Sequence, residues 1–330
     1  MAQDQTKKEA LFNEVKGSLF EFLVAKGLAI AQQDELGFLK SLDRNYLTVL
    51  SQQDRMVRQF YPEMLTFLEN VSKKTVNVIL PYFKHQKMSL QLTGKFSNSA
   101  SARELHEADL LLTMDQGPVP VSLKLNKKNA FVNTKSGGIK SFFLHYFSFL
   151  DPEIQHSFNQ LVDMEFNRMA LELHSFHDME YPGNFSSWVK RGFSELPGEL
   201  SGDERSILKS YYARIASEIH HILEGACKLN AEAFAKSLAP LMGFGSEDIV
   251  QVVCFHDFKG HDDPEIFLHS YEEIIPGLKQ CRILPFQNIS SVEIEVGTWA
   301  LQIRVKPMNK FTTTAIKMNC SVKVKRPSDV

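Results

Sequence analysis

Three polar residues stand close together where the flanking apolar runs are typical of β-strands. Asp109 precedes the run LLLTM, and after a turn at DQGP the run VPVSLKL contains Ser122 and Lys124. Residues two apart lie on one face of a strand, so Ser122 and Lys124 point to the same side. A hairpin of these runs would bring a carboxylate, a hydroxyl and an ammonium to one place.

Such a group suits the hydrolysis of a phosphodiester bond. Near neutral pH this reaction needs a divalent cation, which polarises the phosphoryl oxygen and lowers the pKa of an attacking water. Mg²⁺ prefers oxygen ligands and takes only one or two protein carboxylates. We expect Asp109 and the backbone carbonyl of Leu123 to bind Mg²⁺, while the Leu123 side chain turns to the core. Lys124 would orient the water and stabilise charge that develops on the phosphate.

The elements around the hairpin must hold it in place. Helical periodicity covers 8–33 and continues through 34–72 with a break near Pro62. The β-branched stretches TVNVILPYF, at 75–83, and MSLQLTGKF, at 88–96, predict strands. The order of elements along the chain is helix, sheet, helices, sheet, which is typical of an α/β or α+β domain with a helical insertion.

The rest of the chain predicts one helix-rich and one strand-rich region. IKSFFLHYFSFL predicts a helix of about three turns, and VEIEVG, WALQIRVKPM and AIKMNCSVKVK predict three strands. We expect four regions: an N-terminal helical region, a core with the hairpin, a helical region and a basic β-rich region. Their bounds are 1–74, 75–150, 151–249 and 250–330.

Basic residues gather in two segments that contain no acid. Residues 116–150 and 296–328 hold 12 of the 37 Lys and Arg residues and none of the 39 Asp and Glu residues. A protein with this distribution presents a positive face to an anionic partner while its remaining surface stays acidic. The alternative is a pair of solvated, lysine-rich strand regions.

The hairpin resembles the active-site hairpin of the PD-(D/E)xK nucleases. The type II restriction endonucleases that lack the second acid are the most similar, with a strand of the form S-[IL]-K followed by basic and Asn residues. VSLKLNKKNAFVNTKSGG resembles that strand and its continuation, and the likeness covers 10–30 and 90–145. It implies a restriction-endonuclease-like fold, a mixed β-sheet flanked by helices, with a large helical insertion and a C-terminal β-hairpin region.

Ser122 stands where the family pattern has an acid, so another carboxylate should compensate. In this superfamily a glutamate of the first helix often does so, and EVKGSLFEFLVAKGL resembles that helix. Glu14, Gly17 and Glu21 share one stripe of it, and the small Gly17 would let the helix approach the sheet closely. The resemblance implies Glu21 as the first choice for the metal and Glu14 as the second. Glu107 is a further option.

Basic and amide side chains are the candidates for contact with DNA. Lysines after the hairpin would contact phosphates, which positions a duplex without reading its sequence. Gln302, Arg304 and Lys306 alternate on one face of LQIRVKP, as a ribbon in the major groove requires. They could equally be the polar face of a half-buried strand. The candidates are Lys127, Lys128, Asn129, Lys135, Lys140, Gln302, Arg304, Lys306, Asn309 and Lys310.

The resemblance implies a Mg²⁺-dependent, site-specific deoxyribonuclease that cuts duplex DNA as a homodimer and leaves 5′-phosphate and 3′-hydroxyl ends. A cognate methyltransferase would be encoded separately. The alternatives are a non-catalytic nucleic-acid-binding protein, a nuclease acting on RNA or structured DNA in defence or repair, and a protein that binds an acidic partner. The sequence contains no P-loop motif, so we expect no nucleotide cofactor.

The sequence also bears on the location of the protein. No apolar run is long enough to cross a bilayer, and the N-terminal residues lack the apolar core of a signal peptide. The four cysteines are widely spaced and form no CxxC pair. We therefore expect a cytoplasmic protein without membrane contact, structural zinc or a disulfide framework.

Overall fold

The computed structural model describes residues 2–93, 108–128, 130–245, 248–256 and 263–324, with side chains described from residue 12 onward. They form mixed α/β structure with two five-stranded sheets, one mixed and one antiparallel. The chain divides into two compact units that interleave in sequence. Unit 1 comprises Met1–Ala130 and Phe244–Glu273, and unit 2 comprises Phe131–Gly243 and Ile274–Val330. These bounds cut across the four regions expected from the sequence.

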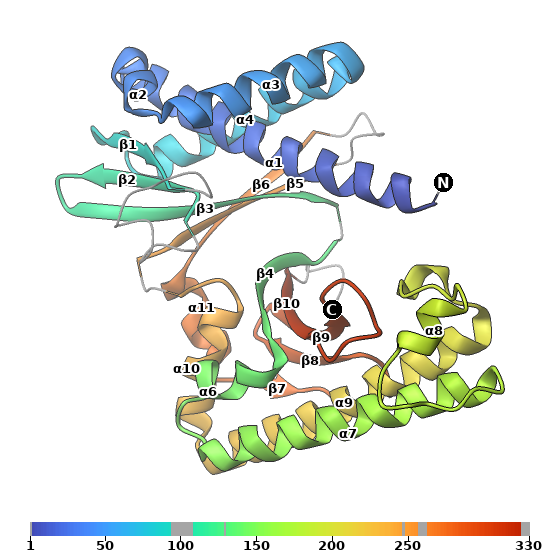
Figure 1. Cartoon of the computed structure of the whole chain (residues 1–330). Helices are drawn as coiled ribbons and strands as arrows, with labels where there is room; N and C mark the ends of the chain where they lie inside the picture. The colour runs from blue at the N-terminus through green and yellow to red at the C-terminus, as the bar shows by residue number, and fades with distance from the viewer. Residues whose placement is uncertain (1, 94–107, 129, 246–247, 257–262, 325–330) are drawn as a thin grey trace. The chain divides into compact units, whose positions relative to one another are not determined.

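Helices of the described part of unit 1 lie over one face of its sheet (Figure 1). They are α1 (Ala2–Ala31), α2 (Glu35–Ser41), α3 (Arg44–Phe60) and α4 (Pro62–Tyr82). Pro62 is the first residue of α4, where its missing N–H removes no helical hydrogen bond, so the predicted break is confirmed.

The prediction of a strand over 75–83 is wrong, because residues 75–82 belong to α4 and Phe83 caps its C-terminal end. Thr75, Val76 and Ile79 are buried at helical spacing and pack into the core of unit 1. Burial of this stripe outweighs the preference of β-branched residues for strands. The next prediction holds in part, since a strand forms within 88–96 at Ser89–Leu92.

The sheet of unit 1 has the strand order β1-β2-β3-β5-β6. Neighbouring strands are antiparallel except β3 and β5, which are parallel. The predicted hairpin is present as β2 and β3, joined by a turn of Asp115 and Gln116. The strands are β1 (Ser89–Leu92), β2 (Leu110–Met114), β3 (Gly117–Lys127), β5 (Val250–His256) and β6 (Glu265–Ser270).

One face of this sheet forms the core of unit 1 together with the helices. Leu112 on β2, Leu123 on β3 and Val252 on β5 are buried in that core. Successive side chains of a strand alternate between faces, so Ser122 and Lys124 lie on the face away from the helices.

Gly17 does not mark a close approach of α1 to the sheet, as the sequence led us to expect. A Cβ at Gly17 would meet nothing within 4 Å, whereas a Cβ at Gly27 would lie 2.9 Å from Val76 Cγ2 on α4. Gly27 is therefore the glycine whose missing side chain allows α1 to pack closely against α4.

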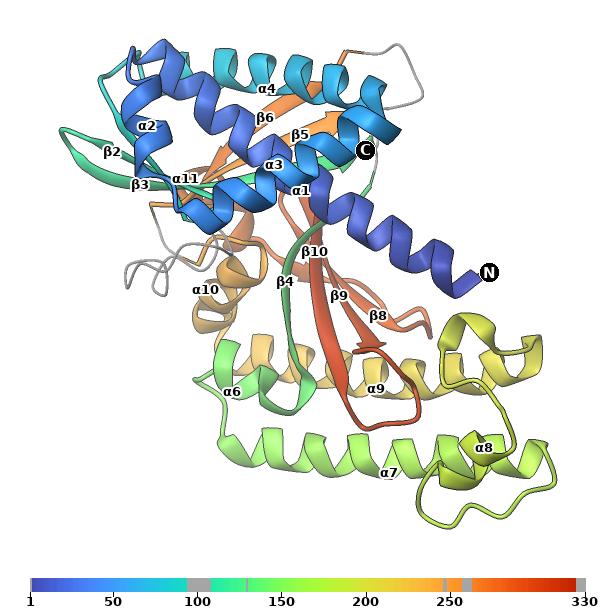
Figure 2. The same ribbon diagram turned by 45° about the horizontal axis from the view of Figure 1, so that its top comes forward.

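Unit 2 places an antiparallel sheet against two long helices. The strand order is β4-β10-β9-β8-β7, and α9 packs against β8 and β9 while α7 runs beside α9 (Figure 2). The strands are β4 (Val132–Gly138), β7 (Arg282–Ile283), β8 (Ser291–Val296), β9 (Trp299–Pro307) and β10 (Ile316–Val324). The three strands predicted in the tail are confirmed as β8, β9 and β10.

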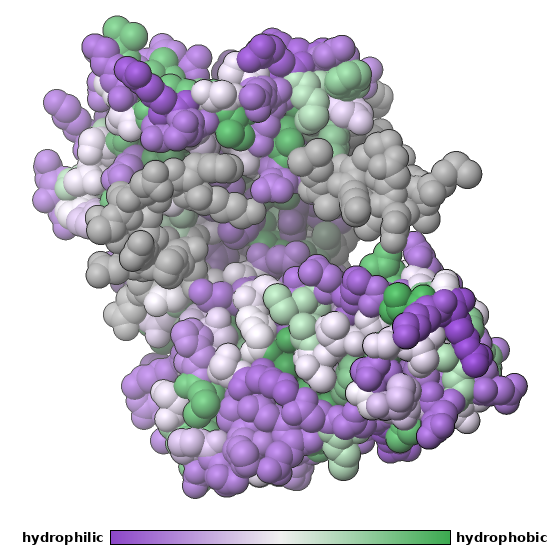
Figure 3. Space-filling view, in the orientation of Figure 1, coloured by the Kyte–Doolittle hydropathy of each residue, from purple (hydrophilic) through white to green (hydrophobic). Residues whose placement is uncertain are grey.

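Helices make up most of the remaining chain. The helix predicted over 139–150 is shorter than expected and ends at Tyr146. The elements are η1 (Ile139–Ser141), α6 (Phe142–Tyr146), α7 (Pro152–Phe176), α8 (Ser186–Lys190), η2 (Pro197–Glu199), α9 (Gly202–Leu229), α10 (Ala231–Leu241) and α11 (Tyr271–Leu278). The surface over α7 is mainly hydrophilic in the view of Figure 3. None of the helices in the described residues has both the length and the apolar character of a membrane span.

Candidate active site

Asp109 lies immediately before the first residue of β2, beside β3. Its N–H donates to the carbonyl of Val121 at 2.9 Å, although the register pairs Val121 with Leu110. Two residues thus oppose one, which is the pattern of a β-bulge, and bulges often terminate pairing and re-aim a side chain next to a functional site. The Asp109 Oδ2 atom accepts the N–H of Leu123 at 2.6 Å and the hydroxyl of Ser122 at 3.4 Å.

Lys124 completes this group. Its Nζ lies 3.6 Å from Asp109 Oδ2, and the Lys124 and Asp109 side chains are 29% and 18% exposed. The ion pair is therefore partly shielded from water yet reachable from outside. Asp109 Oδ1 accepts no hydrogen bond from the described residues. The sheet thus brings together the carboxylate, the hydroxyl and the ammonium singled out in the sequence.

The backbone of Leu123 faces the same edge. Its side chain is 4% exposed and lies in the core, while its N–H points to Asp109, just before the start of β2. The N–H and C=O of one strand residue point to the same side, so the Leu123 carbonyl also faces this edge. This carbonyl and Asp109 Oδ1 are oxygen donors of the kind that Mg²⁺ uses, and Mg²⁺ commonly binds one carboxylate and keeps several waters. The donor set fits a weakly held Mg²⁺.

Asp109, Glu14 and Glu21 do not form a group of three metal-binding side chains. Glu14 is exposed and Glu21 is half-buried. Burial, and after it the charge of Glu21, raises the pKa of Tyr46 on α3, which places Glu21 close to that tyrosine. In the part of the chain that the structure describes, no three His, Cys, Asp or Glu side chains are grouped to hold a metal ion. Glu107 lies outside the described residues.

A lysine that the sequence analysis did not single out lies near the end of β3. Burial lowers the pKa of Lys16 on α1, and the positive charge of Lys127 lowers it further. Lys127 is exposed. Lys128 Nζ lies 3.5 Å from Glu265 Oε1 on β6, and Asn129 lies outside the described residues. The one sequence signal for Lys16 is its position on the first helix, two residues after the candidate Glu14.

The basic residues of β4 and η1 are in unit 2. Burial lowers the pKa of Lys135 on β4. Lys140 donates to both carboxylate oxygens of Asp163 on α7, at 2.7 and 2.8 Å. Lys140, from a stretch of sequence without acids, thus forms an ion pair with an acid from a distant part of the chain.

The polar face of β9 contains a chain of hydrogen bonds. Gln302 is 6% exposed, donates to Glu293 Oε1 at 2.9 Å and accepts from Arg304 at 2.8 Å. Lys306 lies directly opposite Lys317 on β10. Burial lowers the pKa of Lys306, and the charges of Lys317 and Arg304 lower it further. Gln302 is therefore engaged at both ends of its amide, whereas Lys306 faces another cation.

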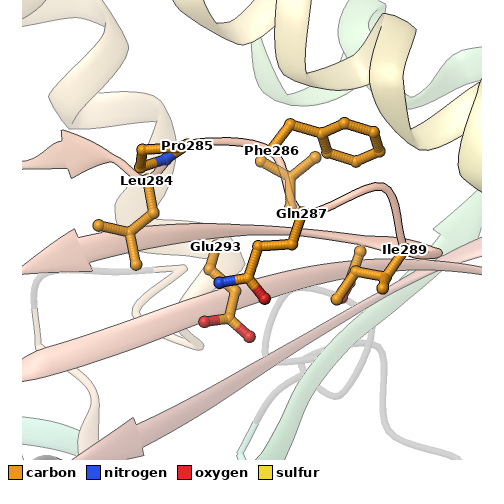
Figure 4. Close-up of a pocket in the computed structure, with 8 residues that line it drawn as sticks. Leu284, Pro285, Phe286, Gln287, Ile289 and Glu293 are labelled. Atoms are coloured by element: carbon orange, nitrogen blue, oxygen red, sulfur yellow. The ribbon is translucent and has the colours of Figure 1, made fainter.

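The remaining candidates follow β9. Lys310 forms an ion pair with Glu195, which also accepts the Thr312 hydroxyl at 2.8 Å. Asn309 is exposed. A pocket between β7 and β8, drawn in Figure 4, contains none of the Asp109 group. Its labelled residues are Leu284, Pro285, Phe286, Gln287, Ile289 and Glu293.

No family model matches the chain, and the comparisons with curated proteins and with solved structures give no match either.

Proposed function

We propose that the chain is a Mg²⁺-dependent endonuclease of the restriction type that hydrolyses phosphodiester bonds of duplex DNA. The observation that carries the proposal is the grouping of Lys124 Nζ, 3.6 Å from Asp109 Oδ2, with the Ser122 hydroxyl on the same carboxylate. A mixed sheet with this hairpin beside a parallel partner strand, and helices over one face, agrees with the fold that the resemblance implies.

Each residue of the group has a role in the hydrolysis of a phosphodiester. The bound cation would polarise the phosphoryl oxygen and acidify a water. Asp109 Oδ1 and the Leu123 carbonyl would hold the cation, while the Leu123 N–H fixes Oδ2 at 2.6 Å. Lys124 would stabilise negative charge that develops on the phosphate, because a preformed cation beside the reacting group costs no reorganisation.

Contacts with the duplex would come from cations that form no ion pair with an acidic side chain of the described residues. Lys127 and Lys306 are of this kind, whereas Lys140 and Lys310 are held by Asp163 and Glu195. A duplex has two strands related by a twofold axis, so cleavage of both is most simply achieved by a homodimer. All four cysteines are free thiols, consistent with the cytoplasmic location that we propose.

The test is cleavage of unmethylated plasmid and phage DNA by the full chain with MgCl₂. We expect discrete fragments, and loss of cleavage by at least a hundredfold in Asp109→Asn and in Lys124→Met, following the size of single catalytic contributions. Lys140→Met serves as the control, because its ammonium is bound to Asp163. A wild-type protein that never cuts, or variants that cut normally, would overturn the proposal.

A non-catalytic nucleic-acid-binding protein is the second candidate. It is favoured by the absence, among the described residues, of a group of three metal-binding side chains. Salt-dependent binding without cleavage would support it. Parallel assays with duplex DNA, single-stranded DNA and RNA distinguish a restriction enzyme from a nuclease for RNA or structured DNA.

A further inference from the structure

A row of polar side chains continues across the sheet of unit 1 from Asp109. Ser122 on β3 is the register partner of Gln251 on β5, and Gln251 is the partner of His269 on β6. Ser122 and Gln251 are 3% and 1% exposed, as buried as the apolar residues of the opposite face. Burial of a polar side chain is costly, so successive buried polar residues in one row indicate a specific role.

Gln251 shares the face of the catalytic group. Its neighbours in sequence, Val250 and Val252, are part of the core on the helix side. Alternation along β5 therefore turns the Gln251 side chain to the face of Ser122 and Lys124. The row ends at His269, whose Nδ1 lies 3.3 Å from Glu273 Oε2.

The Asp109 group is short of oxygen donors for a cation. Asp109 supplies one carboxylate, and Lys124 places a positive charge 3.6 Å from it. Position 122 holds a serine instead of an acid. The neighbouring strand offers a further oxygen donor on this face, because Gln251 is the next described polar side chain across the sheet.

The spacing of strands puts Gln251 within reach. Asp109 and Gln251 lie on either side of β3, so their backbones are about 10 Å apart, two strand spacings. Mg²⁺–oxygen distances of about 2.1 Å on each side, added to the lengths of the two side chains, span this gap. Ser122, which lies between them in the row, has a short side chain.

We propose that Gln251 offers its amide oxygen to the divalent cation bound by Asp109 and so takes the place of the missing second acid. The inference rests on the proposed nuclease function, which requires that cation. A neutral second ligand leaves the site with little negative charge, so the cation is held weakly until phosphate oxygens of the substrate complete its coordination.

Binding of Mn²⁺ alone to the full chain tests this inference without an activity readout. Free Mn²⁺ is measured by electron paramagnetic resonance during titration. We expect Gln251→Ala to weaken Mn²⁺ binding about tenfold, as loss of a supporting group typically does. Gln251→Glu should tighten it by about tenfold or more, because it adds a negative charge next to the cation. Asp109→Ala should abolish it.

Gln155→Ala is the matched control, since Gln155 is also a buried glutamine, at 2% exposed, and belongs to none of the candidate sites. It should leave Mn²⁺ affinity unchanged. If Asp109→Ala loses the ion while both Gln251 variants bind it like wild type, the role of Gln251 is overturned and the nuclease proposal stands. Absence of Mn²⁺ binding in the wild type also overturns the role of Gln251. The nuclease proposal is then tested separately by the DNA cleavage assay. Should Gln251→Ala fail to fold, the near-isosteric Gln251→Glu decides alone, and an unchanged affinity overturns the inference.

Discussion

The carboxylate of Asp109 accepts the backbone N–H of Leu123 at 2.6 Å, so one side chain ties the start of β2 to the middle of β3. The asparagine of Asp109→Asn can still accept this hydrogen bond, whereas the alanine of Asp109→Ala leaves the N–H without it. We expect Asp109→Ala to lower the free energy of unfolding by about 1–3 kcal/mol and Asp109→Asn to lower it by less. Urea denaturation measures both, and equal stability of the alanine variant and wild type would contradict this account.

A second acid in the row should strengthen cation binding at the cost of stability. Ser122 is 3% exposed, so the carboxylate of Ser122→Asp would be desolvated beside Asp109 when no cation is bound. We expect a lower melting temperature in EDTA and a larger rise on addition of MnCl₂ than in wild type. Ser321→Asp, at a position that is 4% exposed in the other sheet, should show no rise from Mn²⁺. Identical Mn²⁺ shifts in Ser122→Asp and wild type would count against a cation at this place.

The two lysines that face each other in unit 2, Lys306 and Lys317, should contribute to the affinity for duplex DNA. Lys306 and Lys317 are direct cross-strand partners, and like charges in such a pair destabilise the sheet. Lys317→Gln should therefore raise the free energy of unfolding by about 0.2–1 kcal/mol. It should also weaken duplex binding and reduce the slope of log affinity against log salt by about one.

Lys310→Gln is the comparison for that experiment, because Lys310 is already paired with Glu195. Its salt slope should stay near that of wild type. Fluorescence anisotropy with a labelled duplex at several salt concentrations measures both variants. Equal slopes for Lys317→Gln and wild type would show that the face of β9 and β10 does not contact phosphates.

The pairing of Glu195 predicts a dependence of stability on pH. Hydrogen bonds from Lys310 and from Thr312 lower the pKa of Glu195 below its usual value. A carboxylate with a lowered folded-state pKa stabilises the protein above its unfolded-state pKa, and this contribution is lost as pH falls through the lowered value. Between about pH 5 and pH 3, wild type should lose more stability than Glu195→Gln. Thermal melts at several pH values measure the difference, and parallel curves would refute it.

The sequence was informative where spacing alone determines geometry. The S-x-K spacing and the turn at DQGP predict the β2–β3 hairpin, and the side chains of Ser122 and Lys124 meet Asp109 on one face as strand alternation requires. The segment 75–83 was misassigned because β-branched residues also fit a buried helical stripe, and only packing against the sheet decides between the two.

For most of the other candidate residues, the sequence could not predict which side chains lie beside them in the folded chain. The position of Glu21 near Tyr46 depends on how α3 packs against α1. The ion pairs of Lys140 and Lys310 join residues far apart in the chain. Gln251 lies in a run that is otherwise apolar, and its register with Ser122 depends on a parallel pairing between distant segments.

That parallel pairing has a consequence for synthesis on the ribosome. Strand β3 ends at Lys127 and its partner β5 begins at Val250, so most of unit 2 is translated before the two can pair. At typical elongation rates the wait is on the order of ten seconds. During that time β3 presents an open edge with Val121 and Leu123 uncovered on one side, which invites pairing with other nascent chains. Slow translation or chaperone capture in this interval would decide how much of the protein reaches its native state.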